Sequence, residues 1–164
     1  MNNELKLIVM NNMKEFGESL NKHLQKLNNN TDNYLVDFSL SRFQNGEGKM
    51  VINETVRCKN VFIVTDVGNY GECYMLHNRE HYISPDEHFQ DIKRAISAIG
   101  GHANKITIVM PLLYESRQHK RKGRESLDCA ISLQELERLG ADDIVTFDCH
   151  DVNVCNAIPT LPFE

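Results

Sequence analysis

Residues suited to binding a phosphorylated ligand follow one of the apolar runs of this chain. The basic loop Tyr114–Arg124 comes directly after the apolar run Ile106–Leu113. Arg117, at its root, offers a planar, permanently charged fork for phosphate, and the Gln118 amide can bond the edge of a purine. Because the chain has a formal net charge of -5, such a loop predicts a local anion site and not a general affinity for polyanions. The alternative is a solvated surface loop.

Thr146, Asp148 and His150 form a second group, at the end of another apolar segment. Alternate residues of a strand point to one face, so this spacing predicts that the three side chains lie together. An acid and an imidazole at the carboxyl end of a sheet suit a complex of cation and phosphate. Asp148 is an oxygen ligand of the kind Mg²⁺ prefers, and His150 would ligate it or bond a metal water or phosphate. The alternative is a capping Asp and a solvent-facing His.

A third group, Phe43–Glu47, has the composition of a hairpin tip. Phe43 is suited to stacking on an adenine, and Glu47 to accepting a hydrogen bond from its exocyclic amine. Asn-Gly also occurs readily in hairpin turns that have no binding role. The local pattern therefore leaves both interpretations open.

The elements that must position these groups alternate between strands and amphipathic helices. This alternation predicts one α/β domain with a mainly parallel sheet flanked by helices. Asp66–Pro85 shows no clear period and is expected to be a long loop. The end, Ile158–Glu164, is expected to be extended. The expected strands are Leu5–Met10, Tyr34–Ser39, Met50–Asn53, Val61–Thr65, Ile106–Leu113 and Asp143–Asp148.

Helices are expected over Lys14–Leu27, Pro85–Gly100 and Ser126–Leu139. Ser84 can cap the second of these, Pro85 suits its first turn, and Gly100 can end it. Apolar residues three to four apart mark the face of each helix that should turn inward. These residues are Phe16, Leu20, Leu24 and Leu27 in the first helix, Phe89, Ile92, Ala95, Ile96 and Ile99 in the second, and Leu127, Ala130, Ile131, Leu133 and Leu136 in the third.

Composition excludes several classes of protein. The 164 residues are enough for one domain, and no apolar stretch approaches the roughly 20 residues of a membrane helix. The N-terminus lacks the features of a signal peptide, so a cytoplasmic location is expected. Five scattered cysteines argue against a disulfide framework, and their spacing matches no common zinc site. The acidic balance argues against nucleic-acid binding as the main role.

Taken in order, these motifs resemble the N-terminal half of ribose-phosphate pyrophosphokinase, a family that makes phosphoribosyl pyrophosphate from ATP and ribose 5-phosphate. The resemblance covers nearly the whole chain, and it is the order and spacing of the pieces that carry it. The matching pieces are Phe43–Glu47, Glu54–Arg57, Asn60–Val64, Ile106–Pro111, Arg117-Gln118, Arg124-Glu125, Gly140–Asp142 and Thr146–His150.

The resemblance implies a phosphoribosyltransferase-like domain that binds ATP, with Mg²⁺ as cofactor. It implies that Arg117, Gln118 and His150 hold ATP, and that Asp148 and His150 organise the metal, with His150 at the catalytic centre. Phe43, Asn45 and Glu47 would grip the adenine of a neighbouring subunit, which implies a homo-oligomer. The family's ribose-phosphate loop and catalytic-loop lysine belong to a second domain and do not occur in residues 1–164, so the fragment alone is expected to be inactive.

Departures from the family pattern identify a divergent member. One extra residue precedes Arg117, and His119 stands where the family has an acid. Asp66–Pro85 is longer than usual, and Asp151–Asn156 replaces a segment through which family members pack together, which puts the oligomer in doubt. These departures keep a second hypothesis open, namely a non-catalytic regulatory homologue that binds nucleotide and assembles with an active synthetase. A third is a stand-alone nucleotide-binding domain.

Overall fold

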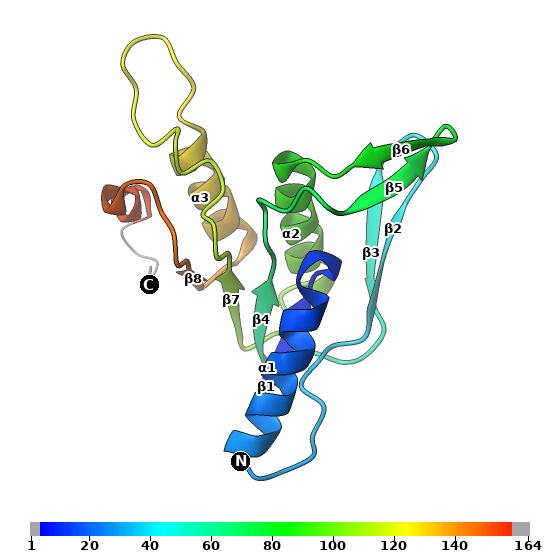
Figure 1. Cartoon of the computed structure of the whole chain (residues 1–164). Coiled ribbons are helices and arrows are strands. Elements are labelled where there is room, and N and C mark those ends of the chain that lie inside the picture. The colour runs from blue at the N-terminus through cyan, green and yellow to red at the C-terminus, as the bar shows by residue number, and fades with distance from the viewer. Residues whose placement is uncertain (1–3, 159–164) are drawn as a thin grey trace.

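A parallel sheet of four strands forms the centre of the computed structural model, which describes residues 4–158. Its strands run in the order β1-β4-β7-β8 (Figure 1). This confirms the predicted α/β class with a parallel sheet. The bounds are β1 Leu5–Val9, β4 Asn60–Val64, β7 Lys105–Val109 and β8 Asp143–Val145.

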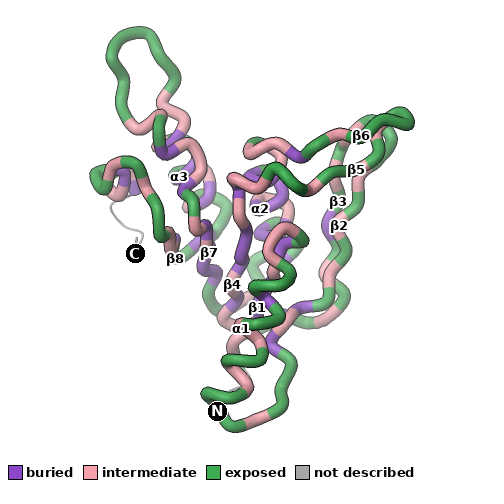
Figure 2. The backbone as a smooth tube through the Cα atoms, in the orientation of Figure 1, coloured by how far each residue is buried: buried purple, intermediate pink, exposed green. Residues whose placement is uncertain are grey.

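Three α-helices cover the sheet, and they are α1 Lys14–Leu27, α2 Pro85–Ile99 and α3 Asp128–Leu139. α2 and α3 pack on the face that carries Ile8, Ile63 and Ile108, all completely buried. Side chains alternate along a strand, so Val9 points to the other face, where it meets Gly17 of α1. The purple segments of Figure 2 mark this core along the sheet, α2 and α3.

The predicted helix spans are close to those observed, but two of the predicted inward faces are partly wrong. In α1, Phe16 is 45% exposed and Leu27 is 71% exposed, and Gly17 is the buried residue. A Cβ on Gly17 would lie 2.6 Å from a methyl of Val9, so α1 approaches the sheet at its glycine. Phe16, the adjacent residue, is rotated away from this contact, and Leu27 lies beyond it at the far end of the helix. In α3, Ile131 is 49% exposed, and Cys129 and Ser132 are buried beside Leu133 and Leu136.

The expected strand Tyr34–Ser39 divides between two sheets. Leu35 makes an isolated parallel bridge with Leu7 of β1. The chain then forms an antiparallel hairpin of β2 Phe38–Arg42 and β3 Gly48–Ile52. Met50 of β3 belongs to the same buried cluster as Ile92 of α2, so the hairpin lies against that helix.

The expectation that Asp66–Pro85 is a loop is wrong. It contains a second antiparallel hairpin, β5 Cys73–Leu76 and β6 Arg79–Tyr82, which lies across the end of the first (Figure 1). Its turn residues His77 and Asn78 have φ of 49° and 61°, the left-handed geometry of a tight two-residue hairpin turn. The strands are only four residues long and the turn lacks glycine, so the usual sequence signals are absent.

Shorter elements complete the described part of the chain. They are two 3₁₀ helices, η1 Asn11–Met13 and η2 Val152–Ala157. The expected extended end, Ile158–Glu164, lies outside the described residues except for Ile158. Within residues 4–158, no helix combines the length and the apolar character that crossing a bilayer requires.

The ends of α2 are as predicted. Ser84 accepts a hydrogen bond from the Glu87 backbone N–H, and the Glu87 carboxylate accepts from the Ser84 N–H, which makes a capping box. Gly100 ends the helix with φ of 61°. Burial raises the pKa of Glu87, but hydrogen bonds from Ser84, His81 and Tyr74 outweigh it, so the pKa lies below its usual value.

We expect Glu87→Gln to change the acid limb of the stability profile. A lowered folded-state pKa stabilises the fold above the ordinary pKa of about 4.5, and this contribution disappears as the pH falls through the folded value. The stability difference between wild type and Glu87→Gln should therefore shrink below about pH 4.5. Urea unfolding between pH 3 and 7 measures it, with the exposed Glu18→Gln as control. A difference that stays constant over this range would contradict the prediction.

Candidate functional site

The carboxyl ends of the four parallel strands meet at one edge of the sheet, and two of the predicted groups lie there. The segment after β8 runs beside the segment after β7, because Leu112 and Asp148 form a parallel bridge. Backbone hydrogen bonds join Leu113 N–H to the Asp148 carbonyl at 3.0 Å, and Asp148 N–H to the Pro111 carbonyl at 2.9 Å. Backbone hydrogen bonds therefore hold the segment that leads into the basic loop beside the segment that carries Asp148 and His150.

The predicted alternation of Thr146, Asp148 and His150 along one strand is wrong. β8 ends at Val145, and the chain bends at Phe147. Thr146 is half-buried, and its hydroxyl donates to the Pro111 carbonyl at 3.3 Å. Asp148 and His150 are exposed, which leaves both available to a ligand.

The start of the loop after β7 is fixed to α2. The Tyr114 ring stacks on Phe89, with the ring centres 4.3 Å apart and the planes 8° from parallel. Its hydroxyl donates to Asp86 at 2.7 Å. Burial and the Asp86 carboxylate raise the pKa of Tyr114 well above its ordinary value, so the phenol remains a donor. The next residue, Glu115, has a left-handed φ of 54°, which turns the chain toward Arg117.

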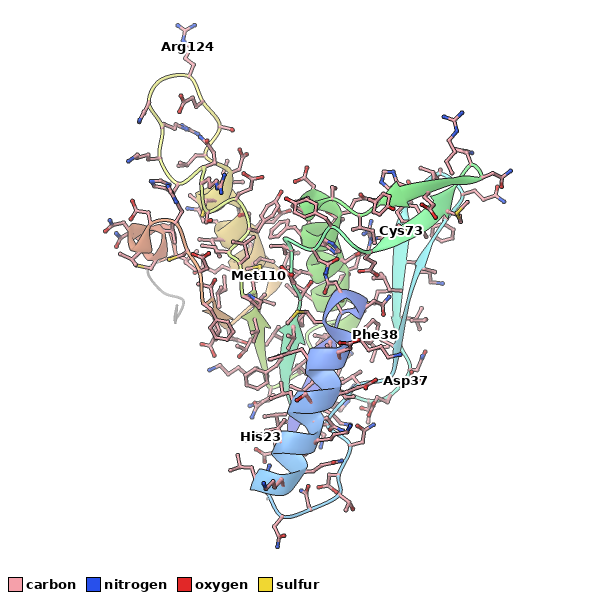
Figure 3. All side chains as sticks on the ribbon, viewed as in Figure 1. His23, Asp37, Phe38, Cys73, Met110 and Arg124 are labelled. Atoms are coloured by element: carbon pink, nitrogen blue, oxygen red, sulfur yellow. The ribbon has the colours of Figure 1, made fainter. Side chains whose placement is uncertain are left out.

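Gln118 closes the basic loop at its base. Its side-chain amide donates to the Ser126 carbonyl at 2.7 Å, and its own carbonyl accepts from the Cys129 backbone N–H at 3.4 Å. Residues 119–125 therefore form a closed lobe that projects from the edge (Figure 1), with Arg124 at its far end (Figure 3). The amide hydrogen used on Ser126 is unavailable to a purine while the loop keeps this shape.

Arg117 is exposed and lines a hollow of about 320 Å³ between the loops that follow β4 and β7. Two aromatic residues, Tyr70 and Tyr114, line the same hollow. A guanidinium beside aromatic rings suits a planar base with an attached phosphate. Neither tyrosine was among the predicted site residues, because Tyr70 belongs to a segment without a period and Tyr114 stands among the charged residues that dominate the basic loop.

His119 connects the basic loop to the segment after β8. Its ring centre lies 5.3 Å from that of His150, and its Nε2 lies 3.2 Å from the Asp151 carboxylate, outside hydrogen-bonding geometry. Its Nδ1 lies 3.2 Å from the Ser116 carbonyl. Backbone and side-chain hydrogen bonds from Asn153 lower the pKa of Asp151, and the nearby His119 adds to this. The sequence offered one signal for His119, its place beside the Arg-Gln pair.

The donors at this edge fit a magnesium ion that arrives with a phosphate. Among residues 4–158, no three His, Cys, Asp or Glu side chains are grouped to enclose a metal. Mg²⁺ usually keeps several waters and binds through one or two carboxylates together with substrate phosphates. The exposed Asp148 carboxylate with His150 two residues on suits that arrangement, and does not suit a closed structural site.

The third predicted group is a hairpin tip, as expected, but it lies far from the other two. Phe43 N–H donates to the Glu47 carbonyl at 2.7 Å, and Gly46 bends the turn with φ of 90°. The Asn45 amide donates to the Glu47 carboxylate at 2.9 Å, which orients both side chains. Phe43 is 52% exposed. In Figure 1 this tip and the basic lobe stand on opposite sides of the molecule.

Arg42, the residue before Phe43, ties the tip to α2. Its two terminal nitrogens donate to the Asp91 carboxylate at 2.8 and 2.5 Å, and Arg94 donates to the same carboxylate at 2.6 Å. The Asp91 side chain is 4% exposed and that of Arg42 is 9% exposed. The hydrogen bond to Asp91, opposed by burial, raises the pKa of Arg42. A fixed base under an exposed tip is a geometry suited to presenting Phe43 to a ligand.

This fold and edge define an α/β domain whose strand-end loops are suited to phosphorylated ligands. Residues 5–140 match the family described as the N-terminal domain of ribose phosphate pyrophosphokinase. The chain belongs to this family, as its motifs indicated.

Individual relatives agree with the family match. The chain is 34% identical over 116 residues to ribose-phosphate pyrophosphokinase 1 of Schizosaccharomyces pombe, covering 70% of this chain and 25% of that protein. It is 28% identical over 152 residues to ribose-phosphate pyrophosphokinase of Corynebacterium ammoniagenes, covering 92% and 41%. The chain thus spans less than half the length of these relatives.

A solved structure shows the same fold. Phosphoribosylpyrophosphate synthetase from Mycobacterium smegmatis superposes with a TM-score of 0.79 at 23% identity, over 98% of this chain and 47% of that one. At this identity the likeness supports the fold and leaves the roles of individual residues to the geometry above.

We expect Asp91→Ala to destabilise the protein by about 3–5 kcal/mol, because it leaves the buried Arg42 and the half-buried Arg94 without their shared carboxylate. Urea unfolding followed by circular dichroism measures the change. Glu135→Ala is the control, since its pair with Lys93 is at the surface and should contribute about 0–1 kcal/mol. Equal losses in the two variants would refute a structural role for the buried cluster.

Proposed function

We propose that this chain is the ATP-binding half of a ribose-phosphate pyrophosphokinase, which transfers diphosphate from Mg-ATP to ribose 5-phosphate. The observation that carries the proposal is the junction of the Arg117 loop with Asp148 and His150 at the carboxyl edge of the sheet. The 1-hydroxyl of ribose 5-phosphate attacks the β-phosphorus of ATP, the bond from that phosphorus to the AMP oxygen breaks, and the hydroxyl proton is released. The products are phosphoribosyl pyrophosphate and AMP.

Such a reaction depends on positioning and on charge neutralisation more than on covalent chemistry with the protein. Arg117 is exposed at the hollow and would pair with phosphate oxygens through its fork of donors. His150 would donate to the polyphosphate from the next segment, with its ring placed beside that of His119. Gln118 would contact the nucleotide through its amide oxygen and its second amide hydrogen, because the first amide hydrogen is bonded to Ser126.

Magnesium is the cofactor of the proposal. Asp148 and His150 would hold it together with waters and phosphate oxygens, and it would supply charge neutralisation for the transferred diphosphate. The protein's own part is to keep Asp148 exposed at the edge through the two backbone hydrogen bonds that flank it.

The adenine is proposed to be bound by Phe43, Asn45 and Glu47 of a second copy of the chain. The exposed Phe43 ring is available for stacking, and the Glu47 carboxylate for the exocyclic amine. A homo-oligomer follows from this assignment, since one site would take residues from two chains.

Three further parts of the proposal concern the whole protein. Ribose 5-phosphate would bind to a second domain, of which residues 1–164 contain none. The protein would work in the cytoplasm. Its acidic net charge of -5 gives no support for a nucleic-acid partner.

One observation favours a second candidate, a non-catalytic homologue that binds nucleotide and assembles with an active synthetase. The turn before Arg117 has Glu115 in a left-handed conformation, and His119 occupies a place where the family pattern has an acid. This arrangement would keep an ATP site while changing its approach to the reacting phosphate. The two candidates differ in turnover and agree in nucleotide binding.

We expect Arg117→Ala and His150→Ala each to weaken Mg-ATP binding by about tenfold or more, the usual loss for a charge-assisted phosphate contact. Titration calorimetry on the 164-residue chain measures this. Matched controls are Arg138→Ala, at the opposite end of α3, and His23→Ala, far from the edge on α1 (Figure 3). Unchanged affinity in both site variants would refute the ATP site.

Turnover is tested by the release of AMP from Mg-ATP that depends on ribose 5-phosphate. The assay is run on this chain and on any longer natural form of the protein. Release by a longer form alone supports the pyrophosphokinase. ATP binding without release by any form supports the regulatory candidate.

A further inference from the structure

The β5–β6 hairpin touches the tip of the β2–β3 hairpin through its inner face. In β5, Tyr74 and Leu76 are half-buried while Cys73 and Met75 are exposed, so the strand has an inner and an outer side. A Cβ placed on Gly46 would lie 3.3 Å from the Tyr74 hydroxyl and 3.9 Å from a methyl of Leu76. The turn that carries Phe43, Asn45 and Glu47 therefore lies directly on Tyr74 and Leu76.

Tyr74 is itself fixed to the first turn of α2. Its hydroxyl donates to Glu87 at 3.0 Å, and the other oxygen of that carboxylate accepts from the Ser84 N–H at 3.0 Å. His81, across the hairpin, lies 3.0 Å from the same carboxylate oxygen. Burial and Glu87 raise the pKa of Tyr74, which keeps the phenol protonated as a donor.

The ring of Tyr74 also meets the base of the tip. The Arg42 guanidinium lies 5.5 Å from its centre, a cation–π contact, and is bonded to the buried Asp91. The tip is thus supported at its base by Arg42 and at its turn by Tyr74 and Leu76. Both supports are hydrogen-bonded to α2, because Arg42 donates to Asp91 and Tyr74 donates to Glu87.

We propose that Tyr74 and Leu76 are positioning residues, and that the β5–β6 hairpin is a brace that orients the Phe43–Glu47 tip for adenine. The choice of adenine as the ligand rests on the proposed function. The structural support of the tip by the hairpin rests on the contacts described above. An unsupported two-stranded hairpin is only marginally stable in water. Fixing the turn before the ligand arrives lowers the entropy that binding must overcome.

The first test measures the tip without any ligand. Hydrogen exchange followed by mass spectrometry reports the amides of Phe43 and Gly46, whose hydrogen bonds close the turn. We expect Tyr74→Ala to speed their exchange by about three- to tenfold through easier local opening. Met75→Ala is the matched control, because its side chain is 63% exposed on the outer side of the same strand. Unchanged exchange at the tip in Tyr74→Ala would overturn the brace.

Tyr74→Phe keeps the test decisive if Tyr74→Ala fails to fold. It retains the ring beneath Gly46 and removes only the hydrogen bond to Glu87, so we expect exchange at the tip to be modestly faster than in the wild type. Leu76→Ala removes the second contact and should accelerate exchange at the tip while the amides of β1 and β4 stay protected. If neither variant changes exchange at the tip, the proposal is wrong.

The second test separates adenine from phosphate. In Tyr74→Ala we expect the affinity for Mg-ATP to fall by about threefold or more, while the affinity for inorganic triphosphate with Mg²⁺ stays unchanged. Faster exchange at the tip with unchanged ATP affinity would overturn the positioning role. A wild-type chain that binds neither ligand would refute the proposed function and the adenine assignment with it. The exchange data would then still decide whether the brace exists.

Discussion

The buried carboxylate of Asp91 is the contact on which the arrangement of this domain depends. A buried charge is stable only when it is paired and hydrogen-bonded, and Arg42 and Arg94 provide both. Arg42 belongs to β2 and Asp91 to α2, so this pair fixes the position of a hairpin on a helix. Because α2 is in turn packed on the sheet through Ile92 and Ile96, the pair relates the hairpin to the whole core.

The first turn of α2 extends the same role to two other segments. Glu87 receives Tyr74 and His81 from the β5–β6 hairpin, and Asp86 receives Tyr114 from the loop after β7. Carboxylates are favoured near a helix N-terminus by the helix dipole, so these acids are stable where they stand. One helix thus positions the hairpin tip on one side and the root of the basic loop on the other.

Much of the fold could be predicted, because its determinants are local. Ser84, Pro85 and Gly100 mark the ends of α2 within the few residues around them, and apolar runs mark the strands of a parallel sheet. The approach of the segment after β7 to the segment that carries Asp148 and His150 also follows from the sequence, since the carboxyl ends of parallel strands share one edge.

The features that escaped prediction depend on partners distant in sequence. The sequence around Asp91 gives no sign that its partner is Arg42, which lies in β2. Likewise, the sequence around Tyr74 gives no sign that its partner is Glu87, in the first turn of α2. The β5–β6 hairpin has only four-residue strands and a His-Asn turn, so its stability comes from the contacts on its inner face. Likewise the bend at Phe147, which ends the alternation after Val145, follows from backbone hydrogen bonds to Pro111 that no local pattern reveals.

The two supports of the hairpin tip, Arg42 and Tyr74, limit which Arg117 loop the tip can reach to form a nucleotide site. In Figure 1 the tip and the Arg117 loop lie on opposite sides of the molecule, with α2 between them. A flexible hairpin could swing across to its own loop, but here Arg42 is bonded to the buried Asp91, and Tyr74 is bonded to Glu87. Such a movement would break a buried ion pair and the capping box network together, which is costly. If the tip binds the adenine of a nucleotide that is held by an Arg117 loop, that loop therefore belongs to a second copy of the chain. The β5–β6 hairpin then stiffens the β2–β3 hairpin that extends to the second copy.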